Sequence, residues 1–390
     1  MSGHPVPPDR YAERLARASE AASARGFDAL LIGVGADLRY LAGYVALPLE
    51  RLTMLVVPAR GRPALVVPRL EALPAMGSPA AAAGLVEVVA WTEIEDPVAI
   101  VGSLVTATAW AGGRAPHGLR LAVSDRLWAT FLLGLQRALP GAEFGLASRA
   151  LRDFRMRKDA DEIELLRLAA EAADRVIAAV AAGPLVGRTE ADVSREIRER
   201  LVAEGHEAAE FAIVGSGPNS ASPHHEASDR RIHAGEPLLL DIGGPFEGYG
   251  SDITRMLWVT GGDPALGPDE AFLHLYDVLA DAQSEATGAV RPGIPAARVD
   301  EVARGIITAA GFGPQFIHRV GHGIGLEGHE EPYLVEGNAE PLDVGMAFSV
   351  EPGIYLEGRY GARIEDIVVC GPEGPVVLNR APRDLLVVAG

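Results

Sequence analysis

The sequence predicts a protein of the α/β (α+β) class with two domains, over about residues 1–150 and 151–390. The chain has 390 residues, which exceeds one average domain. Hydrophobic residues make up 48% and charged residues 23%, enough apolar material for two sizeable cores. The pattern changes near Leu151, where short alternating segments give way to two long helical patterns and then a half dominated by strands.

Helical and strand patterns alternate through the first 150 residues. A charged, Ala-rich helix is expected from Tyr11 to Arg25, because Gly26 follows at the position of a helix C-cap. The other expected elements are apolar strands at 29–32, 52–57, 64–67 and 119–123, and helices at 97–108 and 124–138. This alternation predicts an N-terminal α/β domain with its own core.

The second domain is expected to begin with two helices. Apolar residues recur with a period close to 3.6 over Asp159–Ala182. A second helix over Thr189–Glu204 begins with a capping pattern formed by Thr189 and Asp192. Strands are expected to dominate from residue 211 onward, with helices at 269–289 and 295–310.

Charge and cysteine content exclude several classes of function. The 53 acidic and 35 basic residues give a formal net charge of -18, which repels nucleic-acid phosphates and anionic lipid. Neither nucleic acid nor a membrane is therefore an expected partner. The chain has a single cysteine, Cys370 in an apolar run, so an intrachain disulfide and a multi-cysteine zinc site are excluded. A buried structural thiol is expected there.

From the sequence we expect neither a targeting signal nor a membrane-spanning segment. Residues 1–25 carry charges throughout and contain no apolar stretch of the kind found in signal peptides. We see no run of about 18 uncharged apolar residues that would form a spanning helix. A cytoplasmic location is the expectation.

Four segments of the second domain place an acid in an apolar strand pattern, where a lone carboxylate is costly to bury. They are LLLDIGG with Asp241, YGSDITR with Asp252, SVEPG with Glu351 and RIEDIV with Glu365. A turn over residues 243–248 would make the first two strands antiparallel neighbours and bring their acids side by side. The last two segments repeat this arrangement.

Four carboxylates in one core would repel each other and raise their pKa values. Two divalent cations would remove this conflict, since four negative charges would meet four positive ones. Hard oxygen ligands with one imidazole suit Mn, Co, Fe or Zn. Any one of these acids alone is more often a turn residue or part of a surface ion pair. Their occurrence in two matching strand pairs favours a metal site.

The imidazole is expected from the glycine-rich stretch around His322. Its glycines remove side chains, so that backbone and substrate can approach closely. Residues 323–328 match G-x-G-x-x-G, but Pro332 follows too soon for the helix that a dinucleotide site requires. His318 and His322 are four residues apart, as in helical zinc sites, but the glycines argue against a helix here.

Together these motifs resemble the prolidase and aminopeptidase P family, which are Xaa-Pro metallopeptidases of the pita-bread fold. The resemblance covers about residues 155–385 and rests on LLLDIGG, YGSDITR, HRVGHGIGLEGHEEP, SVEPGIY and RIED in this order. Residues 36–44 are similar to a stretch of the family's N-terminal domain. The resemblance implies a C-terminal pita-bread domain preceded by a smaller creatinase-like α/β domain, and it implies a homodimer.

The resemblance also implies roles for individual residues. Asp241 would bind one metal ion and His322 and Glu351 the other, while Asp252 and Glu365 would bridge the two ions, with manganese as the foremost choice of metal.

The implied reaction is hydrolysis of the peptide bond before proline, in dipeptides or short peptides. Glu351 would move a proton from the attacking water to the leaving nitrogen, and His329 would donate a hydrogen bond to the oxyanion. His224 matches a histidine near the substrate, and His318 and Arg363 match supporting residues of the site. His225 would point the opposite way in an extended segment and is left out.

Three alternatives stay open on the same fold. Creatinase-like amidinohydrolases lack the full set of metal ligands, which argues against them here. The others are an ectoine-hydrolase-like enzyme acting on a small non-peptide amide, and a binding module without catalysis. A dipeptidase also needs a cation for the substrate's carboxylate, and Arg230, Arg231, Arg359 or a residue of a partner subunit could serve.

Overall fold

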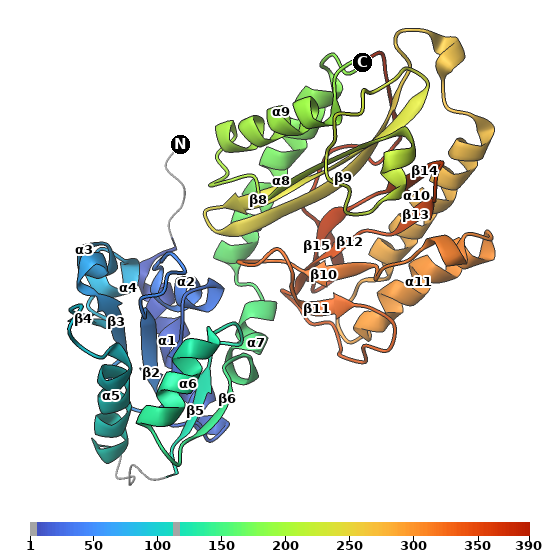
Figure 1. The fold of residues 1–390 in the computed structure, drawn as a ribbon. Helices are drawn as coiled ribbons and strands as arrows, with labels where there is room; N and C mark the ends of the chain where they lie inside the picture. Colours follow the sequence, from blue (N-terminus) through green and yellow to red (C-terminus); the bar gives the residue numbers. More distant parts are fainter. Residues whose placement is uncertain (1–5, 112–117) are drawn as a thin grey trace. The chain divides into compact units, whose positions relative to one another are not determined.

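A computed structural model describes residues 6–111 and 118–390 and divides into two compact units, Met1–Phe154 and Arg155–Gly390 (Figure 1). Both units combine helices and strands, so the predicted fold class is confirmed. Each unit has a hydrophobic core of its own.

The first unit is built on one mixed six-stranded sheet with the strand order β4-β3-β2-β1-β5-β6. The strands are β1 (Ala29–Ile32), β2 (Met54–Pro58), β3 (Ala64–Pro68), β4 (Glu87–Trp91), β5 (Arg120–Val123) and β6 (Glu143–Leu146). Strand β2 is antiparallel to β1 and β3, and the other pairs are parallel.

The helices of this unit are α1 (Pro8–Ala24), α2 (Ala36–Ala42), α3 (Ala72–Met76), α4 (Pro79–Ala82), α5 (Pro97–Ala111) and α6 (Ala129–Ala138), and α7 (Ser148–Met156) continues into the second unit. The prediction that α6 begins at Ser124 is wrong by five residues. Ser124 accepts a hydrogen bond from the Gly33 amide at 3.0 Å, and Asp125 accepts one from the Ser148 amide at 3.1 Å. Such side-chain bonds to distant backbone hold this segment in a non-helical conformation.

Two sheets and a hairpin make up the second unit. One sheet has the order β17-β9-β8-β7, the other β11-β10-β12-β15-β16, and β13 and β14 form the hairpin. Their bounds are β7 (Phe211–Ser216), β8 (Glu236–Phe246), β9 (Tyr249–Val259), β10 (Gly321–Gly323), β11 (Glu330–Leu334), β12 (Ala347–Val350), β13 (Gly353–Leu356), β14 (Tyr360–Arg363), β15 (Asp366–Gly371), β16 (Gly374–Val377) and β17 (Leu386–Val388).

Helices pack on each of these sheets (Figure 1). They are α8 (Ala160–Ala181) and α9 (Glu190–Ala203) on the first sheet, and α10 (Glu270–Ala289) and α11 (Ala296–Ala309) on the second. The capping pattern predicted for α9 is confirmed, because Thr189 and Asp192 each accept a hydrogen bond from the other's backbone amide. Helix α8 begins with a capping box of the same kind.

Strand alternation decides where the acids of β8 and β9 lie. Leu238, Leu240 and Ile242 of β8 pack into the core under α8 and α9. Leu239, one position out of phase, belongs instead to the core on the side of α10 and α11. Asp241 shares the face of Leu239, because successive side chains of a strand point to opposite faces. The acid therefore faces away from α8 and α9.

The turn between β8 and β9 is shorter than predicted. Strand β8 continues to Phe246, and only Glu247 and Gly248 form the turn, with φ of 49° and 89° as in a type I′ hairpin. Gly243 is paired within the strand, and the position requires glycine because a Cβ atom there would lie 2.2 Å from the Ser251 carbonyl oxygen. Asp252 stands opposite Gly243 and Asp241 opposite Thr254, so the two acids are diagonal neighbours on one face, as predicted.

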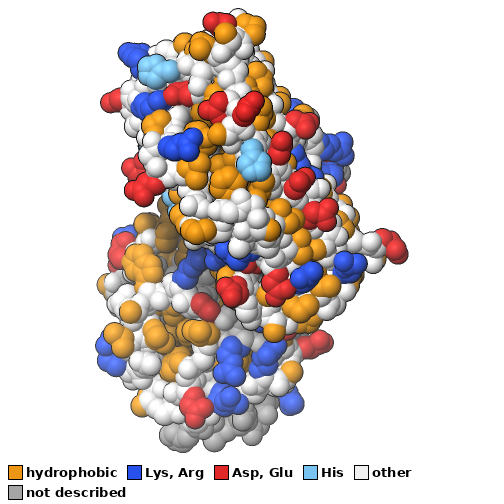
Figure 2. All heavy atoms as spheres, turned by 90° about the vertical axis from the view of Figure 1, so that its right-hand side faces the viewer, with side chains coloured by type: hydrophobic (Ala, Val, Ile, Leu, Met, Phe, Trp, Pro, Cys, Tyr) orange, Lys and Arg blue, Asp and Glu red, His pale blue; other side chains and the backbone are white. Residues whose placement is uncertain are grey.

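The surface mixes charges of both signs. On the face of the molecule drawn in Figure 2, acidic and basic side chains are interspersed with apolar ones over the described residues. Among the described helices, none is both long enough and apolar enough to span a bilayer.

Candidate metal centre

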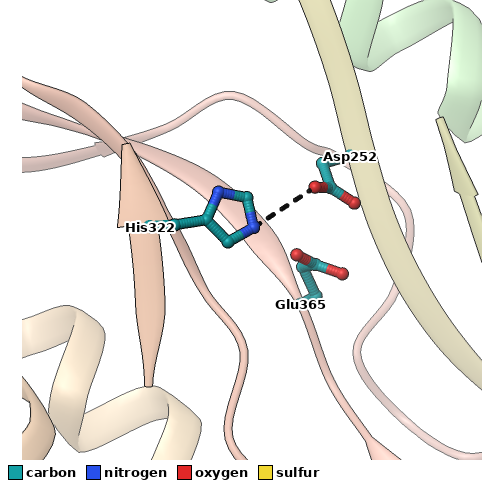
Figure 3. A group of neighbouring side chains, drawn as sticks. All are labelled: Asp252, His322 and Glu365. Atoms are coloured by element: carbon teal, nitrogen blue, oxygen red, sulfur yellow. Dashed lines mark ion pairs between the residues drawn. The ribbon is translucent and has the colours of Figure 1, made fainter. Parts of the chain in front are cut away.

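Three of the predicted ligands meet at one point of the second unit. Asp252 comes from β9, His322 from β10, and Glu365 from the connection between β14 and β15 (Figure 3). All three are buried, and one ligand atom of each lies within 4.8 Å of the others. The Nε2 atom of His322 is 3.6 Å from Oδ2 of Asp252. This group offers two carboxylates and an imidazole to a metal ion.

Glu351 extends the group on the side of His322. It directly follows β12, and its Oε1 atom lies 3.2 Å from Nε2 of His322. Ser349 donates to the same oxygen at 3.0 Å and accepts from the His322 amide at 3.0 Å. Burial raises the pKa of Glu351, but the hydrogen bond and charge of His322 outweigh burial and lower this pKa to about 2.

Asp241 lies on the opposite side of the group and is only half satisfied. Its Oδ2 atom accepts a hydrogen bond from Arg363 at 2.5 Å. Its Oδ1 atom is buried and has no hydrogen-bond partner among the described residues. An unpaired buried carboxylate oxygen is costly, so this atom marks a position that fits a cation.

The electrostatic balance of the site is strongly negative. Burial raises the pKa values of Asp252 and Glu365 well above their usual range, and repulsion by the neighbouring acids raises them further. Within the described site, one guanidinium, that of Arg363, faces the four carboxylates. The residues present therefore fit divalent cations, which would balance this excess of negative charge.

Arg363 and His318, two predicted site residues, converge on Tyr355. Arg363 donates to the Tyr355 hydroxyl at 2.8 Å and to the Thr254 hydroxyl at 3.0 Å. Nε2 of His318 is 2.9 Å from the Tyr355 hydroxyl. Thr254 in turn donates to Glu365 at 2.7 Å. Hydrogen bonds thus link both residues to the acids.

His329 lies beside His322, with ring centroids 3.9 Å apart. It is exposed on one side, while burial on the other side and the nearby charge of His322 lower its pKa to about 4. At neutral pH its imidazole is therefore neutral and can donate one hydrogen bond from its protonated nitrogen.

His224 and His225 have different surroundings. His224 is exposed, and its charge acts on Asp241 and His318, which places it near the acids. Nε2 of His225 instead lies 2.7 Å from Glu190, a fully buried residue at the start of α9. The role of His224 as a site residue stays a prediction.

Glu190 organises the segment that carries His224. Its carboxylate accepts hydrogen bonds from the amide and hydroxyl of Ser216, from the side chain of Asn219, and from the amide and hydroxyl of Ser228. Burial opposes the charge, but the bonds from Ser228, Ser216 and His225 outweigh burial and lower the pKa of Glu190 to about 2. One carboxylate thus holds both ends of the segment from 216 to 228.

Sequence reasoning missed several of these supporting residues. Thr254 and Tyr355 lie inside the motifs YGSDITR and SVEPGIY, and Ser349 is two residues before Glu351. Their position inside the motifs was the available signal. Glu190 carried no such signal, because an acid in the first turn of a helix is expected for capping and dipole reasons alone.

The glycine-rich stretch does not form a dinucleotide site. Strand β10 ends at Gly323, and β11 rather than a helix follows Gly328. A Cβ atom at Gly321 would lie 2.0 Å from the Ser349 carbonyl oxygen, so this glycine allows β10 and β12 to approach closely. The rejection of both the G-x-G-x-x-G reading and the helical His318–His322 reading is confirmed.

Comparison with known families decides the class of the protein. Residues 164–372 match the model of metallopeptidase family M24, and residues 14–157 match the creatinase/prolidase N-terminal domain. The chain belongs to metallopeptidase family M24. It is a metallopeptidase, and the predicted combination of a creatinase-like domain with a pita-bread domain is confirmed. M24 metallopeptidases use divalent metal ions, and Asp252, His322 and Glu365 are a candidate group for binding one.

Several relatives are similar over nearly their whole length. The probable dipeptidase PepE of Mycobacterium tuberculosis is 46% identical over 379 residues, which cover 97% of this chain and 96% of the relative. The crystal structure of dipeptidase PepE from Mycobacterium ulcerans is 46% identical with a TM-score of 0.89, covering 98% and 99%. The Xaa-Pro dipeptidase from Bacillus anthracis is 29% identical with a TM-score of 0.86, covering 97% and 100%. The chain is thus a peptidase of the dipeptidase and prolidase type.

Proposed function

We propose that this M24 peptidase hydrolyses the Xaa-Pro bond of dipeptides or short peptides, using two divalent cations. The observation that carries the proposal is the set of four carboxylates, three of them buried and that of Glu351 half-buried, opposed by one guanidinium, with Oδ1 of Asp241 left unpaired. The similarity to proteins named dipeptidase and Xaa-Pro dipeptidase supports the choice of substrate.

Five residues would hold the cations. Asp241 would serve one ion and His322 and Glu351 the other, with Asp252 and Glu365 shared between the two ions. The contacts support this division, because Glu351 and Asp252 lie near His322 while Asp241 is paired with Arg363. Manganese is the first choice, and Co, Zn and Fe also suit these ligands.

The cations would supply Lewis acidity, which makes hydroxide available near neutral pH and stabilises charge on the scissile carbonyl oxygen. Glu351 would take the proton of the attacking water and deliver it to the proline nitrogen, which has no proton of its own. Its low pKa keeps it ionised at neutral pH, which is the form that can take up a proton. His329, neutral and partly exposed, would donate a hydrogen bond to the oxyanion. His224 and His318 would position the substrate.

Elemental analysis combined with kinetics tests this proposal. The purified protein should retain about two metal equivalents and should cleave Ala-Pro and Gly-Pro faster than Ala-Ala. A longer Xaa-Pro peptide and ectoine should be assayed in parallel. Cleavage of ectoine alone would favour the small-amide alternative, and a protein that binds no metal and cleaves nothing would favour a binding module.

We also propose a homodimer, as the family resemblance implies, and a cytoplasmic location, in line with the expectation from the sequence. Light scattering coupled to size-exclusion chromatography should give twice the chain mass of 41.0 kDa. A monomer that retains full activity would contradict the need for a partner subunit.

A further inference from the structure

The proposed function leaves open which residue recognises the free carboxylate of a dipeptide. Three arginines were candidates, and the structure engages each of them elsewhere. Arg230 forms two 2.6 Å hydrogen bonds with Glu236, and Arg231 donates to a backbone carbonyl at 2.5 Å. Arg359 donates a hydrogen bond to the hydroxyl of Tyr360 at 3.1 Å, and Tyr360 belongs to the core under α10. These contacts favour a different cation of this chain, or one from a partner subunit.

Arg319 is half-buried and has no such commitment. Its guanidinium forms no ion pair with any residue that the structure describes, and it stacks on the ring of Tyr333 with Cζ 4.3 Å from the centroid. Stacking occupies the face of the planar guanidinium and leaves its N–H donors free at the edge. A carboxylate can bind to this edge through two parallel hydrogen bonds.

The position of Arg319 relates it to the candidate metal centre. Tyr333 on β11 stands directly opposite His322 on β10, and directly opposed residues of antiparallel strands are close neighbours. His318, the sequence neighbour of Arg319, lies 2.9 Å from the hydroxyl of Tyr355, which also accepts a hydrogen bond from Arg363. The stacked guanidinium therefore lies at the margin of the acid cluster.

We propose that Arg319, held against Tyr333, binds the C-terminal carboxylate of dipeptide substrates and thereby makes the enzyme prefer dipeptides to longer peptides. The proposal rests on the Xaa-Pro peptidase function proposed above. Arg363, the cation inside the cluster, is already shared between Asp241 and Tyr355. Arg319 would thus be a specificity-determining residue, while the acids and histidines carry out the reaction.

Substrates that differ only in the carboxylate test this role. Ala-Pro and its C-terminal amide should be compared on metal-loaded wild type, Arg319→Ala and Arg319→Lys. In Arg319→Ala the KM for Ala-Pro should rise at least about tenfold with kcat nearly unchanged, because the carboxylate contact is present in both ground state and transition state. Kinetics on the amide should change less than about twofold. Arg319→Lys should be intermediate, since it keeps the charge but loses the planar donor pair.

Arg359→Ala is the matched control, because it also removes an arginine stacked on a tyrosine, with 5.0 Å between Cζ and the ring centroid. It should leave both substrates unaffected. An equal loss on Ala-Pro and its amide in Arg319→Ala would show a merely structural role and overturn the proposal. Unchanged kinetics on both substrates would overturn it as well.

The failure of the proposed function is separately visible. If metal-loaded wild type cleaves no Xaa-Pro substrate, the proposed function is wrong, and calorimetric binding of Ala-Pro and its amide still decides the role of Arg319. A preference for the free carboxylate that disappears in Arg319→Ala supports the role. A preference that is absent from wild type, or unchanged in the variant, overturns it.

Discussion

Glu365 and Asp366 are adjacent in sequence and both buried, yet their surroundings are opposite. Asp366 accepts hydrogen bonds from Arg255 at 2.7 Å, Gln283 at 3.0 Å and Arg383 at 2.5 Å. The carboxylate of Glu365 accepts one from the neutral hydroxyl of Thr254 and is repelled by other acids. Glu365 lies in the connection before β15, and Asp366 is the first residue of that strand.

The comparison teaches which buried acids the chain neutralises by itself. Around Asp366 two arginines and an amide meet one carboxylate, so the region is complete without a bound ion. Around Glu365 four carboxylates share one arginine, and the charge balance can be completed only from outside the chain. The contrast with Asp366, whose charge is balanced within the chain one residue away, supports the proposal that the four carboxylates bind cations.

The largest effect is expected from Asp252→Ala. If Asp252 is shared by two cations as proposed, its removal should abolish metal binding and lower kcat/KM for Ala-Pro at least about a thousandfold. Elemental analysis and kinetics measure the two effects. The control is Asp343→Ala, which removes an exposed acid paired with Arg157 and should leave both unchanged. Full activity of a metal-free Asp252→Ala variant would refute the assignment.

Removing Asp366, whose charge is balanced within the chain, should instead lower the stability of the protein whether or not metal is present. Asp366→Ala leaves the buried Arg255 with an unpaired charge and should lower the free energy of unfolding by about 3–5 kcal/mol. Urea unfolding with and without metal measures this change. The double variant Arg255→Met/Asp366→Leu, which removes both charges, should recover part of the loss. A loss below about 1 kcal/mol would show that Asp366 is not sustained by these contacts.

Glu190 is a second carboxylate that the chain satisfies, and it adds a pH dependence. Glu190→Gln should lower the free energy of unfolding at pH 7 by about 2–3 kcal/mol, because hydrogen bonds to a charged acceptor are lost. The folded-state pKa of about 2 lies below the ordinary value of 4.5. The stabilisation is therefore fully present above about pH 4.5 and is lost as the pH falls toward 2.

Urea unfolding of wild type and Glu190→Gln at pH 7 and at about pH 3.5 tests this sign. The difference between the two proteins should be smaller at the lower pH. A difference that grows on acidification would contradict the account of Glu190 as a charged hydrogen-bond acceptor.

The smallest effect, and the sharpest in sign, is expected from Glu365→Gln. In metal-free protein this change removes an acid whose ionised form is disfavoured by burial and by Glu351 and Asp241, and it should raise the free energy of unfolding by about 1 kcal/mol. In metal-loaded protein it would remove a proposed metal ligand and should lower the free energy of unfolding. Urea unfolding of both forms measures the two signs. Destabilisation in both forms would mean that the charge of Glu365, like that of Asp366, is balanced by contacts within the chain.

The parts of the fold that the sequence predicts best are those set by local interactions. The period of α8 and the capping box of α9 lie within single segments and are found where they were expected. The parallel pairing of β17 with β9 joins residues more than a hundred positions apart and has no local signal. The length of the β8–β9 turn was misjudged because Gly243 and Gly244 serve close packing rather than chain reversal.

The candidate site shows the same division. Asp241, Asp252, Glu351 and Glu365 were recognised because a carboxylate in an apolar strand conflicts with its surroundings. Arg319 was overlooked because its role depends on having no ion-pair partner, which only the folded structure can show. The two-ion ligand set, the proline specificity and the catalytic roles stay predictions.

The two-residue turn at Glu247 and Gly248 also limits where the β8–β9 hairpin can accept insertions or deletions. One residue inserted between Asp241 and the turn, or between the turn and Asp252, would reverse the side-chain parity beyond it and move an acid into the core under α8. Insertions at the turn itself would lengthen the loop and leave both acids in place. Insertions and deletions tolerated by natural or engineered variants should therefore be found at the hairpin tip and be absent from its two arms.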